Sequence, residues 1–224
     1  MADHEQFAKH HHLVIGKTEW PIKASVVQWA DSGLEVHPGK SARRRGSLID
    51  KFVIHWTGGE NDVLTLFKVL AKRELSVEFA IDVEGVIWQF CDPTLVDTFD
   101  AGIVNRTSAG CEIVNHGFTA PGRPAPRSGA ARDTYSRKFR GSQRTFARFY
   151  PAQINAAVAL ADVLSGVLPI PRRIPREVDG SIMARTMTPR ELDSWSGHMG
   201  HFHISDRKCD PGLDLLEALG ASGY

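Results

Sequence analysis

The sequence predicts a single α/β domain in which a central mixed β-sheet is flanked by helices, with an N-terminal arm at its periphery. The chain has 224 residues, of which 42% are hydrophobic and 24% charged. These values are typical of a soluble globular protein and exclude a disordered chain or a coiled coil. Residues 51–59 form an apolar run rich in β-forming residues, whereas residues 61–73 and 150–168 carry apolar side chains at helical spacing. Both strands and helices are therefore expected in one core.

Residues 1–49 mix short apolar runs with turn-forming residues and end in a basic run at 41–46. We expect this segment to be a peripheral arm or extension. The next run, 51–59, ends in two glycines and predicts a buried strand that enters a loop. His55 therefore lies at the end of a strand, where α/β proteins commonly place binding groups.

The middle of the chain predicts a series of regular elements. Residues 61–73 predict an amphipathic helix, and alternating residues on both sides of a turn predict a β-hairpin over 76–91. Residues 109–115 are a further strand candidate in which Glu112 lies among apolar neighbours. The helical spacing of apolar residues predicts a long helix over 150–168. It should end there because the proline that follows cannot continue it.

Residues 121–148 differ in character from the rest of the chain. They hold eight Lys or Arg residues, a single acidic residue (Asp133) and several Pro and Gly residues. We interpret them as an insertion or long loop with a basic surface. Two hypotheses remain open: a solvated excursion without a partner, or attraction to an anionic polymer or substrate that salt would weaken.

The overall charge excludes one class of function and leaves others open. Lys and Arg number 27 against 26 Asp and Glu, a net charge of +1, so a general nucleic-acid binder is not expected. The sequence has no run of about 18 apolar residues. We therefore expect neither a signal peptide nor a membrane span, and we expect synthesis in the cytoplasm. Cys91, Cys111 and Cys209 form no C-x-x-C pair, so we expect reduced thiols.

The segment 197–212 is rich in residues that bind metals. Within thirteen positions it holds His198, His201, His203, Asp206, Cys209 and Asp210. Such a density, together with His55 at a strand end, suggests a zinc site. The residues alone leave the choice among these ligands open.

Several blocks of sequence follow one another in the order found in a known family. They are 52–59 (FVIHWTGG), 79–89 (FAIDVEGVIWQ), 109–112 (AGCE), 150–153 (YPAQ), and the pair 200–201 (GH) with 207–212 (RKCDPG). This set resembles the zinc-dependent N-acetylmuramoyl-L-alanine amidases of the amidase-2 family, which includes phage amidase lysozymes and peptidoglycan recognition proteins. The resemblance spans about residues 50–216 and implies a zinc amidase domain over 50–224, with the basic insertion inside it.

The resemblance also implies a ligand set. The three zinc ligands would be His55, His201 and Asp210. Asp210 is preferred because it stands immediately before Pro-Gly, although some members have a Cys there and Cys209 is adjacent. His201 is preferred to His198 and His203 because it follows a glycine, as in the family block.

Two further residues match catalytic positions of the family. Zinc with three protein ligands keeps a position for water, lowers the pKa of that water to about 7 and polarises a carbonyl group, and amide hydrolysis needs both effects. A carboxylate must move the proton of the attacking water, and Glu112 matches that residue; the alternative is an exposed carboxylate at a strand edge. Lys208 matches a lysine that stabilises the oxyanion; the alternatives are a surface lysine or a contact with a substrate carboxylate.

The sequence departs from the family pattern at two places. Glu78 and Asp100 stand where many members carry a histidine. Neither is a zinc ligand in the resemblance, but both positions line or support the substrate groove. Trp56 and Trp88 could border the same groove for sugar or peptide, or pack in the core.

The resemblance implies hydrolysis of the amide between N-acetylmuramic acid and L-alanine in peptidoglycan or in soluble muropeptides. Three contexts fit the expected lack of a signal: a phage endolysin, an exported effector and a cytoplasmic recycling enzyme. A peptidoglycan-binding module without catalysis is the main alternative. A zinc-stabilised nucleic-acid binder that uses the basic insertion is a second alternative, which the near-neutral charge disfavours.

Overall fold

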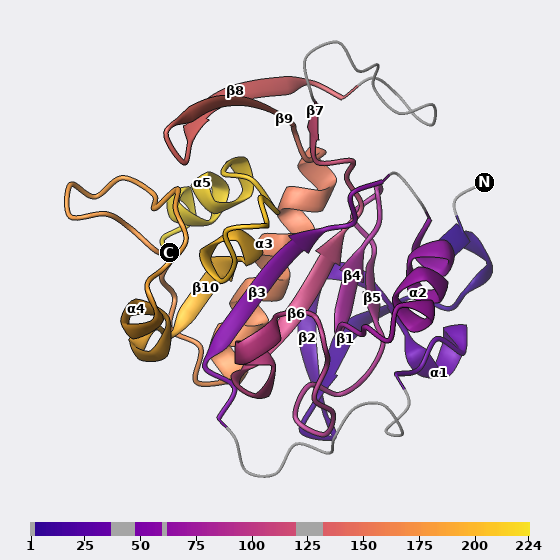
Figure 1. Ribbon diagram of the computed structural model, residues 1–224. Helices are drawn as coiled ribbons and strands as arrows, with labels where there is room; N and C mark the ends of the chain where they lie inside the picture. Colours follow the sequence, from indigo (N-terminus) through magenta and orange to yellow (C-terminus); the bar gives the residue numbers. More distant parts are fainter. Residues whose placement is uncertain (1–2, 37–47, 60–61, 120–131) are drawn as a thin grey trace.

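A seven-stranded mixed sheet forms the centre of the protein (Figure 1). The computed structural model describes residues 3–36, 48–59, 62–119 and 132–224. The strands of the central sheet are β1 (His10–Ile15), β2 (Thr18–Gln28), β3 (Lys51–Trp56), β4 (Phe79–Ile81), β5 (Ile87–Gln89), β6 (Ser108–Ile113) and β10 (Gly197–Gly200). Their order is β1-β2-β5-β4-β6-β3-β10. Strands β4, β6, β3 and β10 run parallel to one another, while β5 pairs antiparallel with β4.

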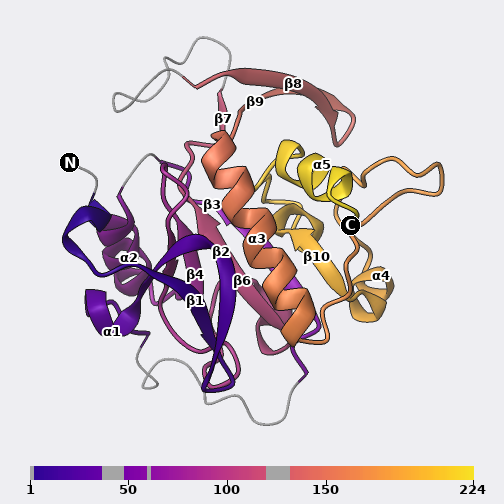
Figure 2. The ribbon, with the colours of Figure 1, turned by 180° about the vertical axis from the view of Figure 1, so that it is seen from behind.

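Helices cover both faces of this sheet. They are α1 (Trp29–Ser32), α2 (Val63–Lys72), α3 (Pro151–Val167), α4 (Pro189–Ser194) and α5 (Asp214–Ala221), with 3-10 turns at Asp3–Gln6, Gly102–Thr107 and His201–His203. Helix α3 lies across one face, as the view from behind shows (Figure 2). Helix α2 packs with Ala80 and Trp88 of the opposite face. In the part of the chain that the structure describes, no helix has both the length and the apolar character needed to cross a membrane. The predicted fold class is confirmed.

The alternation of side chains along β3 and β6 decides which residues are free for chemistry. Phe52 and Ile54 of β3 lie in the core cluster beneath α3, as do Cys111 and Ile113 of β6. Because successive side chains of a strand point to opposite faces, His55 and Glu112 project from the other face of the sheet. The predicted strands and helices of the middle of the chain are confirmed as β3, α2, the β4–β5 hairpin, β6 and α3.

The described part of the N-terminal arm is built into the edge of the sheet. Strand β2 pairs parallel with β5, and β1 pairs antiparallel with β2. The Gln89 side chain ties β1 to the sheet, because its amide donates to the Val14 carbonyl at 2.7 Å and accepts from the Val14 N–H at 3.0 Å. The segment therefore lies at the periphery but extends the sheet by two strands. The basic run 41–46 lies outside the described residues.

For residues 121–148 the sequence predicted an insertion or a long loop, and the loop alternative is wrong for the part that the structure describes. Strands β8 (Thr134–Phe139) and β9 (Ser142–Ala147) form a hairpin that joins β7 (Phe118–Thr119) in a second, three-stranded sheet. Apolar side chains on one face of the hairpin, Phe139 and Phe146 among them, belong to the main core. This burial explains the regular structure. Residues 121–131 lie outside the described part.

Candidate metal centre and active site

Three parallel strands end side by side at one edge of the sheet. In the pairing of β3 with β6, His55 stands opposite Glu112, and in the pairing of β10 with β3, Gly200 stands opposite Ile54. His201, the residue after Gly200, therefore follows beside His55. Because carboxyl ends of parallel strands share an edge, the sheet alone places two of the predicted ligands and the predicted catalytic carboxylate together.

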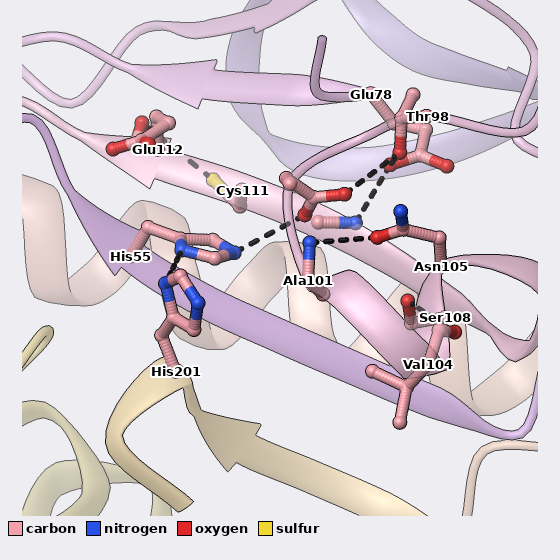
Figure 3. A network of polar contacts seen from close by, with 12 residues as sticks. His55, Glu78, Thr98, Ala101, Val104, Asn105, Ser108, Cys111, Glu112 and His201 are labelled. Carbon is pink, nitrogen blue, oxygen red and sulfur yellow. Dashed lines mark hydrogen bonds and ion pairs between the residues drawn. The ribbon is translucent and has the colours of Figure 1, made fainter. Parts of the chain in front are cut away.

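His55, His201 and Asp210 converge on one point. Figure 3 shows the facing rings of His55 and His201. Their exposed fractions are only 2%, 8% and 6%. The Nδ1 atoms of the two histidines lie 2.9 Å apart, and Asp210 Oδ2 lies 3.2 Å from Nδ1 of His55 and 3.1 Å from Nδ1 of His201. The backbone joins the two ligand-bearing segments, because the Phe202 N–H donates to the Asp210 carbonyl at 3.1 Å.

This arrangement fits a zinc ion. In a tetrahedral site with bonds of about 2.0–2.1 Å, the ligand atoms lie about 3.3 Å from one another. The three observed separations are slightly shorter than this value. Two imidazole nitrogens and one carboxylate oxygen are a donor set that zinc accepts, and three protein ligands leave one position for substrate or water. When both facing Nδ1 atoms are unprotonated, their lone pairs repel each other unless a cation lies between them.

The pKa values of His55 and Asp210 favour charged side chains in the cluster, whereas burial lowers the pKa of His201. Burial alone would lower the pKa of His55, but hydrogen bonds with Asp100 and Asp210 outweigh it and raise the pKa to about 10. Burial would likewise raise the pKa of Asp210, but the hydrogen bonds with His201 and His55 hold it well below its usual range. The cluster in the protein alone therefore carries an imidazolium beside a carboxylate, at the place that a divalent cation would occupy.

Glu112 carries a buried oxygen without a partner. Its Oε2 makes no hydrogen bond among the residues that the structure describes. Burial raises the pKa of Glu112 to about 8; the charges of His55 and Lys208 oppose the shift, and those of Asp210 and Asp100 add to it. A half-buried carboxyl group that has one buried oxygen without a hydrogen bond and a raised pKa is suited to accept and return a proton.

The cluster opens into a pocket of about 270 Å³. Glu112 and the exposed Lys208 line this pocket together with His55, His201 and Asp210. The structure thus brings all five predicted site residues around one cavity. Trp56 also lines the pocket, while its ring centroid lies 6.0 Å from that of Phe146. Trp88 is 1% exposed and its indole donates to Asp82, so it belongs to the core and does not border the groove.

The alternative ligands of the segment 197–212 lie differently. Cys209 lines the pocket, but the three-residue cluster contains Asp210 in its place. His198 is fully buried and its Nε2 lies 2.7 Å from Ser165 Oγ. The Nε2 of His203 lies 3.0 Å from the Met183 carbonyl. Both histidines are therefore engaged in the core.

Asp100 lies closer to the proposed metal ligands than the sequence indicated. The sequence placed it only in or near the groove, whereas its Oδ2 lies 3.1 Å from Nε2 of His55. It also lines the pocket. The one signal available in the sequence was the departure from the family pattern at this position.

The comparison with protein families now identifies the chain. The model of a family described as N-acetylmuramoyl-L-alanine amidase (amidase-2) matches residues 45–213, which is well over half of the chain. The chain belongs to the amidase-2 family. Comparison with curated protein sequences gives no significant match.

Solved structures with a similar fold include other members of the amidase class. One is the amidase AmiD from E. coli in complex with anhydro-N-acetylmuramic acid-L-Ala-D-γ-Glu-L-Lys, with 21% identity, a TM-score of 0.50, and coverage of 87% of this chain and 67% of that chain. Another is AmpDh3 from Pseudomonas aeruginosa, with 20% identity, a TM-score of 0.50, and coverage of 80% and 61%. A third is the Ph2119 endolysin from a Thermus scotoductus bacteriophage, with 10% identity, a TM-score of 0.50, and coverage of 88% and 98%. At these identities the likeness to the three structures concerns the fold.

Proposed function

We propose that this amidase-2 domain hydrolyses the amide bond between N-acetylmuramic acid and L-alanine in peptidoglycan, with zinc held by His55, His201 and Asp210. The observation that carries the proposal is the buried His-His-Asp cluster with the unpartnered carboxylate oxygen of Glu112 in the same pocket. Membership of the family supports the choice of substrate. AmiD, which has the same fold, is seen with a substrate of this chemical class.

Each residue of the pocket would have a separate role in amide hydrolysis. Bound zinc would supply the Lewis acidity that activates water and polarises the scissile carbonyl. Glu112 would take a proton from the attacking water and deliver one to the leaving amine of L-alanine. Its pKa of about 8 in the protein alone would fall beside a divalent cation, into the range where the carboxylate can accept a proton at neutral pH.

Lys208 would stabilise the negative charge that develops on the carbonyl oxygen. It stands two positions before Asp210, on the wall of the pocket, and its side chain is exposed. Because the ammonium group is hydrated in the free enzyme, it would lose water only when it approaches the oxyanion. Such electrostatic stabilisation is often the largest catalytic contribution of a single side chain.

The test is a parallel digestion of intact sacculi and soluble muropeptides, with and without a chelator. Mass spectrometry should find stem peptides with a free L-alanine amino terminus and glycan with a free lactyl carboxylate. The chelator should abolish both products and added zinc should restore them, whereas Glu112→Gln should bind zinc without turnover. A wild-type protein that binds peptidoglycan but releases neither product would refute catalysis and leave a binding module.

The same digestion separates the biological contexts. Faster release from intact sacculi is expected for a lytic enzyme such as an endolysin or an exported effector. Faster release from soluble muropeptides is expected for a recycling enzyme. Exposed residues such as Arg207 and Lys208 form part of the pocket wall, so the pocket lies at the surface of the protein.

A further inference from the structure

His55 is held from both sides of its ring. Its Nδ1 faces His201 and Asp210, and its Nε2 lies 3.1 Å from Asp100 Oδ2. The side chains of His55 and Asp100 are only 2% and 4% exposed. When a carboxylate accepts the Nε2 proton, the Nδ1 lone pair is left free to bind a metal, and the plane of the ring is fixed.

Asp100 is itself held by a second layer of polar contacts that includes Thr98 and Glu78, which lie close together in Figure 3. The Thr98 hydroxyl oxygen lies 3.0 Å from Asp100 Oδ1 and 2.7 Å from Glu78 Oε2. Glu78 is fully buried and accepts the Gly110 N–H at 2.7 Å. The two acidic residues that replace the histidines of many family members are therefore linked through one threonine.

Space for the Asp100 carboxylate exists because residue 110 is a glycine. A Cβ atom at Gly110 would lie 1.8 Å from Asp100 Oδ2 and 2.8 Å from its Cγ. The backbone of Gly110 is not in the left-handed region, so alanine is compatible with the strand conformation. A methyl group at this position would therefore displace the carboxylate without straining β6.

We propose that Asp100 is a positioning residue that fixes the orientation and tautomer of His55 for metal binding, with Thr98, Glu78 and Gly110 holding its carboxylate in place. This inference rests on the proposed function, because it takes His55 as a metal ligand. A buried carboxylate is costly unless its hydrogen bonds are satisfied. Here Asp100 Oδ2 faces Nε2 of His55, and Oδ1 lies 3.0 Å from the Thr98 hydroxyl, whose single proton it shares with Glu78. Partners of this kind commonly change metal affinity by about 10- to 100-fold.

The experiment compares the zinc affinity of full-length variants by competition with a chromophoric chelator. Asp100→Ala should weaken zinc binding by about 10- to 100-fold, and Gly110→Ala, which keeps the carboxylate but moves it, should have an effect of the same sign. Asp100→Asn should lose less, because the amide oxygen can still accept from Nε2. Asp92→Ala is the matched control: Asp92 is also buried, at 4%, but it accepts from the backbone of Gly16 and Lys17 and does not line the pocket.

Two spectroscopic readouts separate positioning from general stability. The absorption spectrum of the cobalt-substituted protein should change in Asp100→Ala and remain unchanged in Asp92→Ala. Nitrogen-15 NMR of the zinc-loaded protein should show a protected Nε2–H of His55 in the wild type, and its exchange with water should become fast in Asp100→Ala. Should Asp100→Ala fail to fold, Asp100→Asn and Thr98→Val decide the same question.

Unchanged zinc affinity, cobalt spectrum and Nε2–H signal in the Asp100 variants would overturn the inference. Failure of the proposed function gives a different result. A wild type that binds zinc tightly but cleaves no muropeptide refutes the proposed function and leaves the comparison of affinities valid. A wild type that binds no zinc overturns both.

Discussion

Glu112→Gln should change activity and stability in opposite directions. Glutamine keeps the size of the side chain but can neither take a proton from water nor return it. General acid–base catalysis by one residue contributes about 10²- to 10⁴-fold, which corresponds to about 3–5 kcal/mol of the activation barrier. We expect turnover to fall by this factor while zinc binding is retained.

The gain in stability follows from the raised pKa of Glu112. Below pH 4.5 the carboxyl group is protonated in both the folded and the unfolded chain. As the pH rises from 4.5 towards 8, the unfolded chain releases this proton while the folded protein keeps it, so the free energy of unfolding falls with pH. A shift from 4.5 to about 8 sets an upper bound of about 5 kcal/mol. Because the residue is only partly buried, we expect on the order of 2 kcal/mol.

Chemical denaturation of the metal-free proteins at pH 5 and pH 8 measures this effect. Glu112→Gln should be close to wild type at pH 5 and more stable at pH 8, and Glu112→Asp is a control that keeps the charge. Wild-type turnover in Glu112→Gln would refute its role as proton acceptor. Lower stability of the variant at pH 8 would show that Glu112 is a structural residue and that the raised pKa is wrong.

Four further predictions concern other parts of the site and its support. His55→Ala and Asp210→Ala should each lose stoichiometric zinc, measured by plasma mass spectrometry, together with all activity. Lys208→Ala should lower kcat by about 10²-fold with zinc retained; a change confined to KM would make it a substrate contact. Burial lowers the pKa of His198 to about 3, so this residue should contribute a loss of about 1.4 kcal/mol for each pH unit between 6.5 and about 3, and His198→Asn should reduce the slope in denaturation curves by that amount. Arg140→Ala should lower the free energy of unfolding by about 2–3 kcal/mol and weaken zinc binding, measured by denaturation and chelator competition.

The part of the site that depends on strand ends and short motifs could be predicted from the sequence. His55 lies at the end of an apolar run that indicates a strand, and the resemblance to the family favoured Asp210 over Cys209 because Asp210 stands immediately before Pro-Gly. The contact between Asp100 and His55 could not be predicted, because it depends on how the loop before β6 folds over a neighbouring strand. Such a contact between residues 45 positions apart leaves no periodic pattern.

The sequence did not predict strands β1 and β2 or the β8–β9 hairpin, and the physical reasons differ. Strand β2 pairs with β5, which lies about sixty residues later in the chain, and the β1–β2 register is interrupted between His10 and His12. In the β8–β9 hairpin, polar and charged side chains make up most of the residues, whereas the buried face has only a few apolar residues, such as Phe139 and Phe146. A local pattern detects an element only when one face contributes most of its residues to the core.

Two basic residues of this hairpin make contacts within the protein that neither hypothesis from the sequence, a solvated loop or an anion-binding surface, had predicted. Arg140, at the turn between β8 and β9, donates to the carbonyl groups of Phe202, Ser205 and Asp206. Arg137 pairs with Glu217 of α5 at 3.1 Å. Both guanidinium groups thus bind elements that flank the predicted ligands, and Arg140 binds the very segment that joins His201 to Asp210. A guanidinium that donates to several carbonyl oxygens has fewer N–H donors left for the anionic groups of a polymer. Through Arg140 and Arg137, the described part of the insertion therefore supports the segment that carries the proposed ligands His201 and Asp210.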